Sequence, residues 1–507
     1  MGLIIRQSVK AAVVSYLGVV IGMVNVLFIS LRFLSTEEVG LTRVIFETSL
    51  LFASLAHLGT PFITDKFFPY FKNEEEKHQG FLAFLLTYSL VGYGLFTLLF
   101  LLLRERIAAY YLENSPRLIG YFYFVLASTF FIMYQAITES YCRIHGRIVV
   151  PTIVRELFLK SANIAVIIGY GVGWYSFDTF ILLSTGSYAL AVVFNFLYIR
   201  WLGRLYLRPD FTRINRKRLL EISAYGLFII LGGVGTVLSQ KIDAIMLPAM
   251  RGLDYTAIYG VAFLIAQVIE IPKRAISQIS SPILSQAWKS NDLRQIESLY
   301  RKSAVNQLLA GMLLFLLMWS SIDALFSILP KSDVYKQGKY VVLLISLSRL
   351  VDMGTGLNGE IILYSRHYRF ATLAVVVLAV TTIVTNLLLI PLYALNGAAL
   401  ATAASVLVFV LIKVVFVRIR FGIHPFAPGV LLVLLMGAVV YFIASIVPVP
   451  PPTSFLNAVL SIAIRSLVVA GLFLPLVYLG NVSPDLNGVA GALLTKARNL
   501  LPKKPVR

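Results

Sequence analysis

Ionisable side chains stand inside long apolar runs of this chain, where each one requires a polar cavity, a ligand or a partner of opposite charge. They are Glu139, Lys160, Lys241, Asp243, Glu270, Lys273, Arg274, Arg349, Asp352, Glu360 and Arg465. A charge at the centre of a membrane-spanning helix costs at least ~2.5–3.5 kcal/mol, so such residues are rarely retained without a role. They are therefore the candidates for chemistry on a charged ligand or ion, with structural ion pairing as the alternative.

The composition identifies an integral membrane protein. The chain has 507 residues, of which 58% are hydrophobic and 13% charged, whereas soluble domains carry roughly 25% charged residues. The net charge of +20 does not predict nucleic acid binding, because Lys and Arg gather in short segments between apolar runs. A single cysteine, Cys142, excludes an intramolecular disulfide and a cysteine-based zinc site. We expect no metal and no cofactor, because no glycine-rich phosphate loop or nucleophile–base pair is recognisable.

Apolar runs of about 20 residues predict about fourteen membrane helices. The predicted spans are 8–30, 42–64, 80–103, 118–141, 149–171, 177–199, 221–248, 256–283, 304–329, 340–363, 370–391, 395–417, 426–447 and 456–479. The first lacks a small-residue cleavage site and is read as a helix rather than a signal peptide. An even count places both termini on one side. Loops on that side hold roughly three times as many Lys and Arg, which predicts cytoplasmic termini.

Two stretches carry similar landmarks. His145 and Arg147 align with His367 and Arg369 at an offset of 222 residues, and Gly40 aligns with Gly260 at an offset of 220. Positively charged helix ends also recur by chance, but two landmarks at nearly the same offset favour a parallel repeat with its pseudo-twofold axis along the membrane normal. The two glycines are predicted at outer turns, where they serve either as a gate hinge or, as we favour, as ordinary tight turns.

The repeat predicts a modular organisation. The predicted parts are an N-lobe of helices 1–6 (1–200), a basic cytoplasmic linker (201–220), a C-lobe of helices 7–12 (221–420), helices 13 and 14 (421–480) and a basic cytoplasmic tail (481–507). Helices 13 and 14 then lie outside the repeat. The two histidines are expected to contact helix termini, lipid headgroups or loops rather than a metal.

The second lobe resembles a known family. The stretch from Ile242, IDAIMLPAMRGLDYTAIYGVAFLIAQVIEIPKRAISQISSPILSQAWKSND, has Asp243, Gly260, Pro272 and Pro282 in the pattern of helices seven and eight of bacterial polysaccharide and lipid-linked oligosaccharide flippases. Tyr259 precedes Gly260 here, whereas the family pattern has the tyrosine after the glycine. The junction NLLLIP (386–391) and LNGAALAT (395–402) resembles the family's helix eleven to twelve connection, and LSTEEVG (34–40) its first lobe. The family belongs to the multidrug/oligosaccharidyl-lipid/polysaccharide exporter superfamily.

This resemblance implies an all-α transporter whose two six-helix lobes form a V around a central cavity. The implied function is flipping of a polyprenyl-diphosphate-linked oligosaccharide to the outer leaflet of the bacterial plasma membrane by alternating access, for O-antigen, lipopolysaccharide, capsule or exopolysaccharide synthesis. A diphosphate needs cations, and we expect Lys241, Arg274 and Arg349 to hold it. Arg349, Asp352, Gly356 and Glu360 recur at helical spacing and are expected to share one cavity-lining face; a structural Arg349–Asp352 pair is the equal alternative.

Acidic side chains inside the spans are cavity-lining or ion-coupling candidates. They are Glu139, Asp243, Asp352 and Glu360, with Glu139 and Glu360 foremost for a proton or sodium ion. Lys241 and Asp243 are two residues apart and should face different neighbours. Arg465, near the middle of helix fourteen, either snorkels, pairs with a neighbouring helix or marks a lateral groove.

Two other functions compete with the flippase. A multidrug antiporter of the same superfamily shares the fold but usually stops at twelve helices. A polyprenyl-sugar glycosyltransferase or polymerase would need a sizeable extramembrane region, which the short predicted loops do not supply, so no enzyme is expected. The expected partners are the lipid-linked oligosaccharide, membrane lipids and polysaccharide polymerase or other assembly proteins, with one chain as the working unit and no nucleic acid.

Overall fold

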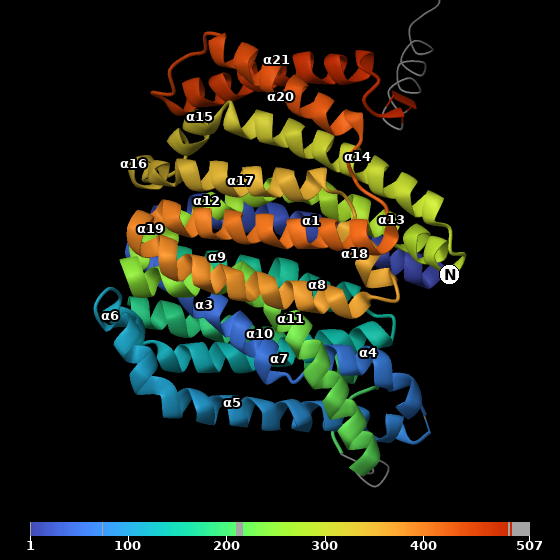
Figure 1. The fold of residues 1–507 in the computed structure, drawn as a ribbon. Coiled ribbons are helices and arrows are strands. Elements are labelled where there is room, and N and C mark those ends of the chain that lie inside the picture. Colours follow the sequence, from blue (N-terminus) through green and yellow to red (C-terminus); the bar gives the residue numbers. More distant parts are fainter. Residues whose placement is uncertain (1, 74, 209–215, 485–486, 489–507) are drawn as a thin grey trace, which may run out of the picture. The chain divides into compact units, whose positions relative to one another are not determined.

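The computed structural model describes residues 2–73, 75–208, 216–484 and 487–488, and across these residues the secondary structure is helical (Figure 1). The first half contains α1 (Gly2–Val24), η1 (Asn25–Ile29), α2 (Ser30–Phe33), α3 (Thr36–Ala56), α4 (Thr60–Phe71), η2 (Lys77–Gly80), α5 (Phe81–Leu112), α6 (Pro116–Ile119), α7 (Phe122–Ile144), α8 (Val149–Ile153), η3 (Val154–Phe158), α9 (Leu159–Gly171), α10 (Phe177–Trp201) and α11 (Arg216–Arg251). The second half contains α12 (Leu253–Gln267), η4 (Val268–Glu270), α13 (Ile271–Lys289), α14 (Leu293–Trp319), α15 (Ile322–Ser327), α16 (Ser332–Tyr335), η5 (Lys336–Gly338), α17 (Lys339–Gly354), α18 (Asn358–Tyr364), α19 (Tyr368–Phe421), α20 (Pro428–Ile446) and α21 (Phe455–Leu479).

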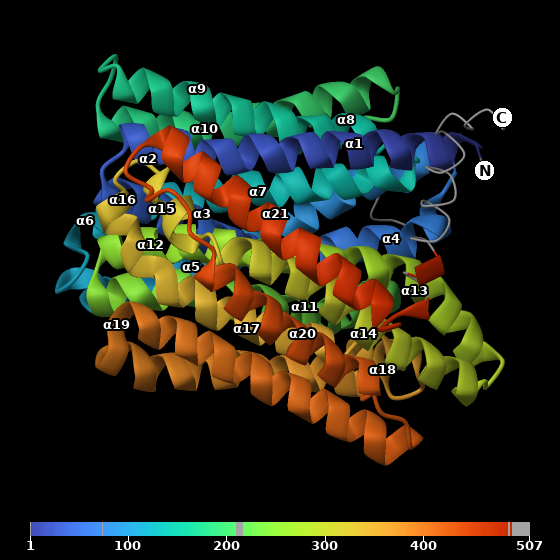
Figure 2. The ribbon, with the colours of Figure 1, turned by 90° about the horizontal axis from the view of Figure 1, so that it is seen from above.

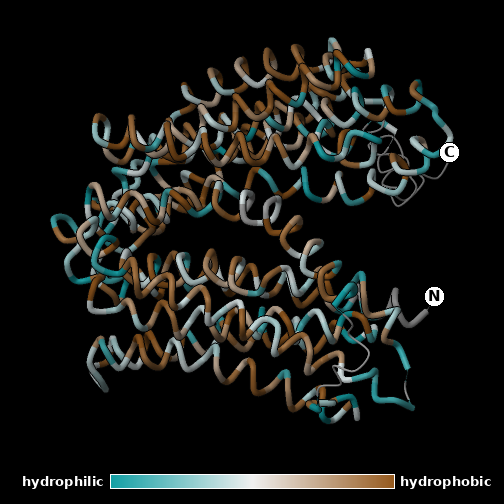
Figure 3. Tube along the Cα trace, turned by 60° about the horizontal axis from the view of Figure 1, so that its bottom comes forward, coloured by the Kyte–Doolittle hydropathy of each residue, from teal (hydrophilic) through white to brown (hydrophobic). Residues whose placement is uncertain are grey.

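The predicted all-α membrane class is confirmed. By length and apolar composition, ten helices among the described residues could cross a membrane, or eleven when a bent pair counts as one span. One of the ten, α19, contains two predicted spans. Figure 2 shows α9 and α10 side by side within unit 1. The predicted spans 149–171 and 221–248 coincide with α8–α9 and α11. Figure 3 shows apolar residues recurring along the helices.

Packing divides the chain into two compact units. Unit 1 comprises residues 1–261 and 379–398, and unit 2 comprises residues 262–378 and 399–507. These units differ from the lobes that the repeat predicts, and the lobe boundaries remain predictions. The predicted linker and tail fall partly outside the described residues.

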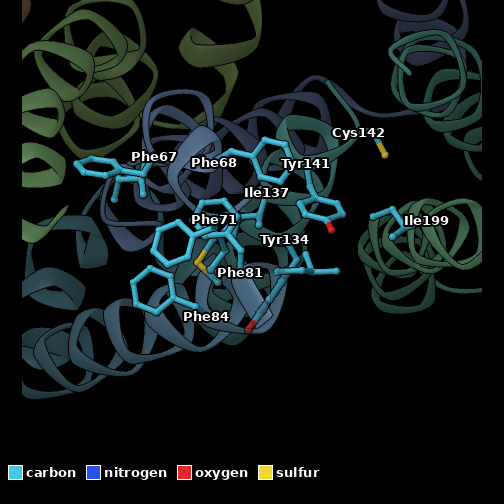
Figure 4. Close-up of a cluster of buried hydrophobic side chains, with 14 of the residues drawn as sticks. Phe67, Phe68, Phe71, Phe81, Phe84, Tyr134, Ile137, Tyr141, Cys142 and Ile199 are labelled. Carbon is cyan, nitrogen blue, oxygen red and sulfur yellow. The ribbon is translucent and has the colours of Figure 1, made fainter. Parts of the chain in front are cut away.

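Buried aromatic side chains form a core of unit 1. Helices α4, α5, α7 and α10 contribute to one cluster, which Figure 4 shows with Phe71 beside Phe81. The Phe71 and Phe81 rings stack with centroids 4.8 Å apart. Aromatic pairs at such distances add roughly 0.5–1.5 kcal/mol to the burial of their area. This core fixes α7, which carries Glu139, one of the predicted site residues.

The start of α3 explains how the first-lobe motif folds. Ser35 caps the helix by accepting from the Glu38 backbone N–H at 3.1 Å, while Glu38 Oε2 accepts from the Ser35 backbone N–H at 2.8 Å. This reciprocal capping box satisfies donors that the first helical turn leaves unpaired. The motif therefore encodes a helix start.

Gly40 and Gly260 lie inside α3 and α12, so their predicted place in turns is wrong. A Cβ on Gly40 would stand 2.0 Å from the Leu253 carbonyl oxygen. A Cβ on Gly260 would stand 1.7 Å from the Arg43 guanidinium. Gly40 is required because the start of α12 approaches α3 more closely than a side chain permits, whereas at Gly260 the space is occupied by the Arg43 side chain. The aligned landmarks thus share a packing role within unit 1.

The last turns of α11 are held by side chains from α5 and the turn after it. Tyr111 donates to the Ile245 carbonyl at 3.0 Å, and Ser115 donates to the Pro248 carbonyl at 2.7 Å. Asn114 donates to the Ala249 carbonyl at 2.9 Å. The last four carbonyls of a helix, which here include those of Pro248 and Ala249, lack partners within the helix, so these donors stabilise the end of the helix that carries Lys241 and Asp243.

One predicted helix of unit 2, spanning 340–363, is broken. The helix predicted to carry one charged face ends at Gly354. Gly356 then has a φ of +62°, and α18 starts at Asn358. The α17 and α18 axes differ by 51°. The predicted common face of Arg349, Asp352, Gly356 and Glu360 is therefore wrong, because the left-handed glycine redirects the chain before Glu360. In α19 a break at Ala394, with a φ of 48°, falls between the predicted spans 370–391 and 395–417.

The two repeat histidines occupy helix ends, as expected. His145 caps the C-terminus of α7 and packs against Phe68, while its Nδ1 contacts the Arg204 guanidinium. His367 caps the N-terminus of α19 and packs against Phe416. Burial, the nearby Arg204, His78 and Lys72 together lower the pKa of His145 to about 3.

Substituting Gly40 by alanine should lower the midpoint of thermal unfolding. The new methyl group would force α3 away from the Leu253 carbonyl. The matched control is Gly94→Ala, because a Cβ there meets nothing within 4 Å, and alanine is favoured over glycine in a helix by about 1 kcal/mol. Thermal unfolding in detergent measures both. Equal midpoints for the two variants would contradict the close approach.

Acid should destabilise the end of α7 through His145. Its pKa is lower in the folded chain than in the unfolded chain, so the unfolded state binds the proton more readily. The resulting stability is present above pH 6.5, the ordinary value, and is lost as the pH falls toward 3. The wild type should therefore lose more thermal stability between pH 7 and pH 4 than His145→Gln. His367→Gln is the control and should retain the wild-type acid response.

Candidate functional site

Three helices of unit 2 bring an aspartate and two lysines together inside apolar sequence. Lys273 of α13 donates from Nζ to Asp352 Oδ2 of α17. Lys413 of α19 places its Nζ 3.9 Å from Asp352 Oδ1. Asp352 and Lys413 expose only 7% and 6% of their surface, so the charges are desolvated and depend on each other.

Two arginines share one carboxylate beside this group. Arg349 of α17 and Arg274 of α13 each lie 3.7 Å from Glu270 Oε2. The Arg349 side chain is 14% exposed and its Nε is buried without a hydrogen-bond partner, whereas the Arg274 side chain is 64% exposed. Two guanidinium groups on one carboxylate leave an excess of positive charge and a donor available for a ligand.

These contacts show which ion-pair partners the predicted site residues of unit 2 have. Arg349 and Asp352 each have a different ion-pair partner, so the predicted alternative of a pair between them is not formed. Glu360, at the start of α18, has no ion pair within 4 Å among the described residues. Of the acidic candidates it is the one without an ion pair or hydrogen bond in the described part of the chain, although it interacts electrostatically with Lys273 and Lys413 over a longer distance.

Lys413 is absent from the candidates that the sequence analysis predicts, although the sequence contains a signal that identifies it. It is the only charge in the run SVLVFVLIKVVFV (405–417). Such a lysine in an otherwise apolar helix is by default a functional or paired residue. The lysine also lies 3.9 Å from the centre of the Phe409 ring, which a cation favours.

Lys241 and Asp243 face different neighbours in unit 1, as predicted. Lys241 Nζ lies 2.5 Å from Glu47 Oε2 of α3, and Glu47 was also absent from the sequence candidates. Asp243 is buried and accepts hydrogen bonds from Tyr259 and, at 2.7 Å, from Asn386 Nδ2. These contacts join α11 to α12 and to the part of α19 that belongs to unit 1.

Glu139 belongs to a separate charged network in unit 1. Its Oε2 lies 2.6 Å from Arg155, which also contacts Glu156 at 3.0 Å. Glu156 pairs with Lys160 at 2.8 Å, and Lys160 donates to the Gly18 carbonyl of α1 at 2.8 Å. Arg155 and Glu156 lie in η3, a π-helical turn, a feature that is frequent at functional sites. Glu139 is therefore paired rather than free.

The described residues contain no group of three or more His, Cys, Asp or Glu side chains placed to hold a metal ion. The chemistry available to the unit 2 cluster is instead electrostatic binding of an anion. Lys273, Lys413, Arg274 and Arg349 outnumber the carboxylates of Asp352, Glu270 and Glu360. Because this surplus lies among apolar helices, an anionic group bound there would interact strongly with it.

Comparisons with known proteins agree with this architecture. A family model described as polysaccharide biosynthesis protein matches residues 6–288. No curated protein sequence matches the chain. A solved structure of the lipid II flippase MurJ in an inward closed conformation is similar with a TM-score of 0.66 at 14% identity, covering 92% of this chain and 98% of that chain.

Multidrug transporters are also similar. An inward-facing multidrug resistance MATE family transporter of the MOP superfamily gives a TM-score of 0.63 at 14% identity, covering 82% of this chain and 98% of that chain. An outward-facing structure of such a transporter gives 0.52 at 16% identity, covering 83% and 95%. These likenesses confirm the predicted two-lobed transporter fold, and they show the fold rather than the substrate.

Asp352 and Lys413 should respond differently to substitution. Asp352→Asn would leave the buried Lys413 and the partly buried Lys273 without their shared carboxylate, and breaking a buried pair costs about 3–5 kcal/mol. Lys413→Met removes one cation and leaves the Lys273–Asp352 pair intact, so it should be neutral or stabilising. Thermal unfolding in detergent distinguishes them. A Lys413→Met chain as unstable as Asp352→Asn would contradict this arrangement.

Proposed function

Because the chain belongs to the polysaccharide biosynthesis protein family, whose model matches more than half of it, we propose that it is a flippase for a polyprenyl-diphosphate-linked oligosaccharide. The cargo moves from the inner to the outer leaflet of the bacterial plasma membrane by alternating access, for assembly of a surface polysaccharide such as O-antigen, capsule or exopolysaccharide. Both termini are cytoplasmic in this proposal, as the distribution of Lys and Arg predicts.

The observation that carries the proposal is the arginine pair on Glu270. A diphosphate offers negative charge and several acceptor oxygens, and a guanidinium can meet them with two parallel hydrogen bonds. Arg349 supplies a buried Nε donor that has no hydrogen-bond partner and lies 3.7 Å from Glu270 Oε2, and Arg274 is the most exposed of the proposed cations. The headgroup would replace Glu270 as the partner of one arginine.

Lys241 has a supporting place in this proposal. Its contact with Glu47 compensates both charges in unit 1, so it can meet a phosphate only by exchanging that partner. Such an exchange costs less than bringing an unpaired lysine into the bundle, because the lysine keeps an anion in either state. We therefore retain Lys241 of unit 1 as a candidate phosphate contact, separately from Arg274 and Arg349 of unit 2.

The energy source follows from the charge of the cargo. A diphosphate that moves outward in an inside-negative cell gains ~2.3 kcal/mol per charge for each 100 mV. If an ion is also coupled, Glu360 is the carboxylate best placed to bind it, because Glu139 and Asp352 are paired with cations and Asp243 is held by Tyr259 and Asn386.

A multidrug antiporter is the second candidate, because that class shares the fold. The flippase structure, however, covers 92% of this chain, against 82% for the inward-facing multidrug transporter. The two helices beyond the predicted repeat, α20 and α21, would account for this difference in the covered share of the chain. It favours the flippase architecture.

Flipping should be measured in proteoliposomes with a fluorescent undecaprenyl-diphosphate oligosaccharide, with and without an inside-negative potential. We expect protein-dependent movement that the potential accelerates. Arg349→Gln should slow it by about tenfold or more, since a charged hydrogen bond contributes roughly 1.5–3 kcal/mol. Lys289→Gln is the control, because Lys289 is exposed at the end of α13.

The contradicting result is a chain that moves none of several lipid-linked sugars but exports small organic cations against a proton or sodium gradient. That outcome would identify the multidrug branch. Normal flipping by a chain in which Lys241, Arg274 and Arg349 are all alanine would leave the function intact and refute the residue assignment.

A further inference from the structure

A polar pocket of about 100 Å³ lies at the end of unit 2 where α14 and α20 end and where α17 begins. Figure 1 shows α15, α20 and α21 gathered around the end of α14. One water needs roughly 10–15 Å³ of such space, so the pocket admits a group of several heavy atoms. Its lining includes Trp319, Ser320, Asp323, Lys339, Tyr441 and Arg465.

Arg465 has no acidic partner in this pocket. Among the described residues no carboxylate lies within 4 Å of it, and Asp323, the acid in the lining, is paired with Lys339 at 2.7 Å. Arg465 instead donates from Nη1 to the Ser320 carbonyl. The pocket therefore has a net positive charge that the chain does not neutralise.

Two further atoms indicate an incomplete set of contacts. Arg465 Nε and Ser320 Oγ are both buried and have no hydrogen-bond partner. Buried polar atoms in native proteins are nearly always paired, so orphaned donors beside a cavity point to a ligand that supplies acceptors. An oxyanion meets this need, because a guanidinium presents several donors in one plane.

The aromatic lining of the pocket indicates a lipid headgroup rather than a soluble anion. Arg465 lies ten residues after the start of α21, about 15 Å along the helix at 1.5 Å per residue, and its long side chain reaches the end of α14. Trp319 is the last residue of α14, and Tyr441 lies near the end of α20. Trp and Tyr are enriched at the level of lipid headgroups.

We infer that Arg465 and the surrounding pocket bind the phosphate of a lipid headgroup. The site goes beyond the proposed flipping function and shares none of the residues around Glu270. By the orientation proposed above it opens toward the outer leaflet. Two lipids carry the required chemistry, namely an anionic membrane phospholipid and the diphosphate lipid after its transfer, and both bring oxyanion acceptors to the guanidinium.

The test is native mass spectrometry of the full chain in detergent with three added lipids. Dioleoylphosphatidylglycerol has a phosphate, dioleoylglycerol lacks one, and undecaprenyl diphosphate has two. We expect dioleoylphosphatidylglycerol to bind at least tenfold more tightly than dioleoylglycerol. Arg465→Gln should remove this preference, because a charged hydrogen bond contributes roughly 1.5–3 kcal/mol and 1.4 kcal/mol corresponds to tenfold. Arg420→Gln, at the exposed end of α19, should retain it.

Competition between the two phosphate lipids identifies the source. If undecaprenyl diphosphate displaces phosphatidylglycerol from the wild type but not from Arg465→Gln, the substrate lipid uses the site; if it does not compete, the site is for phospholipid. Equal phosphate preference in the wild type and Arg465→Gln overturns the inference.

Arg465→Lys is the control for misfolding. It retains the charge but not the planar fork, so it should weaken binding by a smaller factor. If both variants misfold, the wild type itself decides, and the absence of greater thermal stabilisation by phosphatidylglycerol than by dioleoylglycerol overturns the inference.

Discussion

Each charge that this chain carries into its apolar helices requires a counter-charge, a ligand or a route to water, since the surrounding residues cannot solvate it. The contact of Asp352 with Lys273 and Lys413 shows how the requirement is met, because three helices are joined through one carboxylate. The same rule accounts for the Lys241–Glu47 pair in unit 1 and for the Glu139 network. Where compensation is incomplete, as at Glu270 and Arg465, the chain has the means to bind an anion.

Breaks in the helices place these charges. The left-handed Gly356 separates Asp352 from Glu360, so that one remains in the lysine pair while the other begins a new helix. The close approach of the start of α12 to α3 at Gly40 is the equivalent device in unit 1. Small residues at helix contacts and left-handed residues at helix breaks thus determine which helices meet. Ion pairs have the same effect in the helix interiors.

Apolar run length and the order of motifs were sufficient to predict an all-helical membrane transporter, and the family match confirms the resemblance. Pairing partners could not be predicted, because they depend on which helices meet. Glu47 and Lys413 became visible only through their contacts with Lys241 and Asp352. Helical periodicity also failed between Arg349 and Glu360, since a single positive φ at Gly356 ends the register on which periodicity depends. The sequence predicts Gly40 in a turn, because sequence alone does not distinguish a glycine that bends the chain from one that allows a neighbouring helix to approach closely.

The central claim is that surplus cations of unit 2 recognise a diphosphate. Equilibrium binding of undecaprenyl diphosphate and of undecaprenol tests it most directly, with the Arg465→Gln chain used so that the second pocket does not contribute. The account predicts that the diphosphate binds at least tenfold more tightly than the alcohol and that adding Arg349→Gln abolishes the difference, because each charged hydrogen bond contributes roughly 1.5–3 kcal/mol. Equal affinity for the two lipids, or a preference that survives Arg349→Gln, would contradict it.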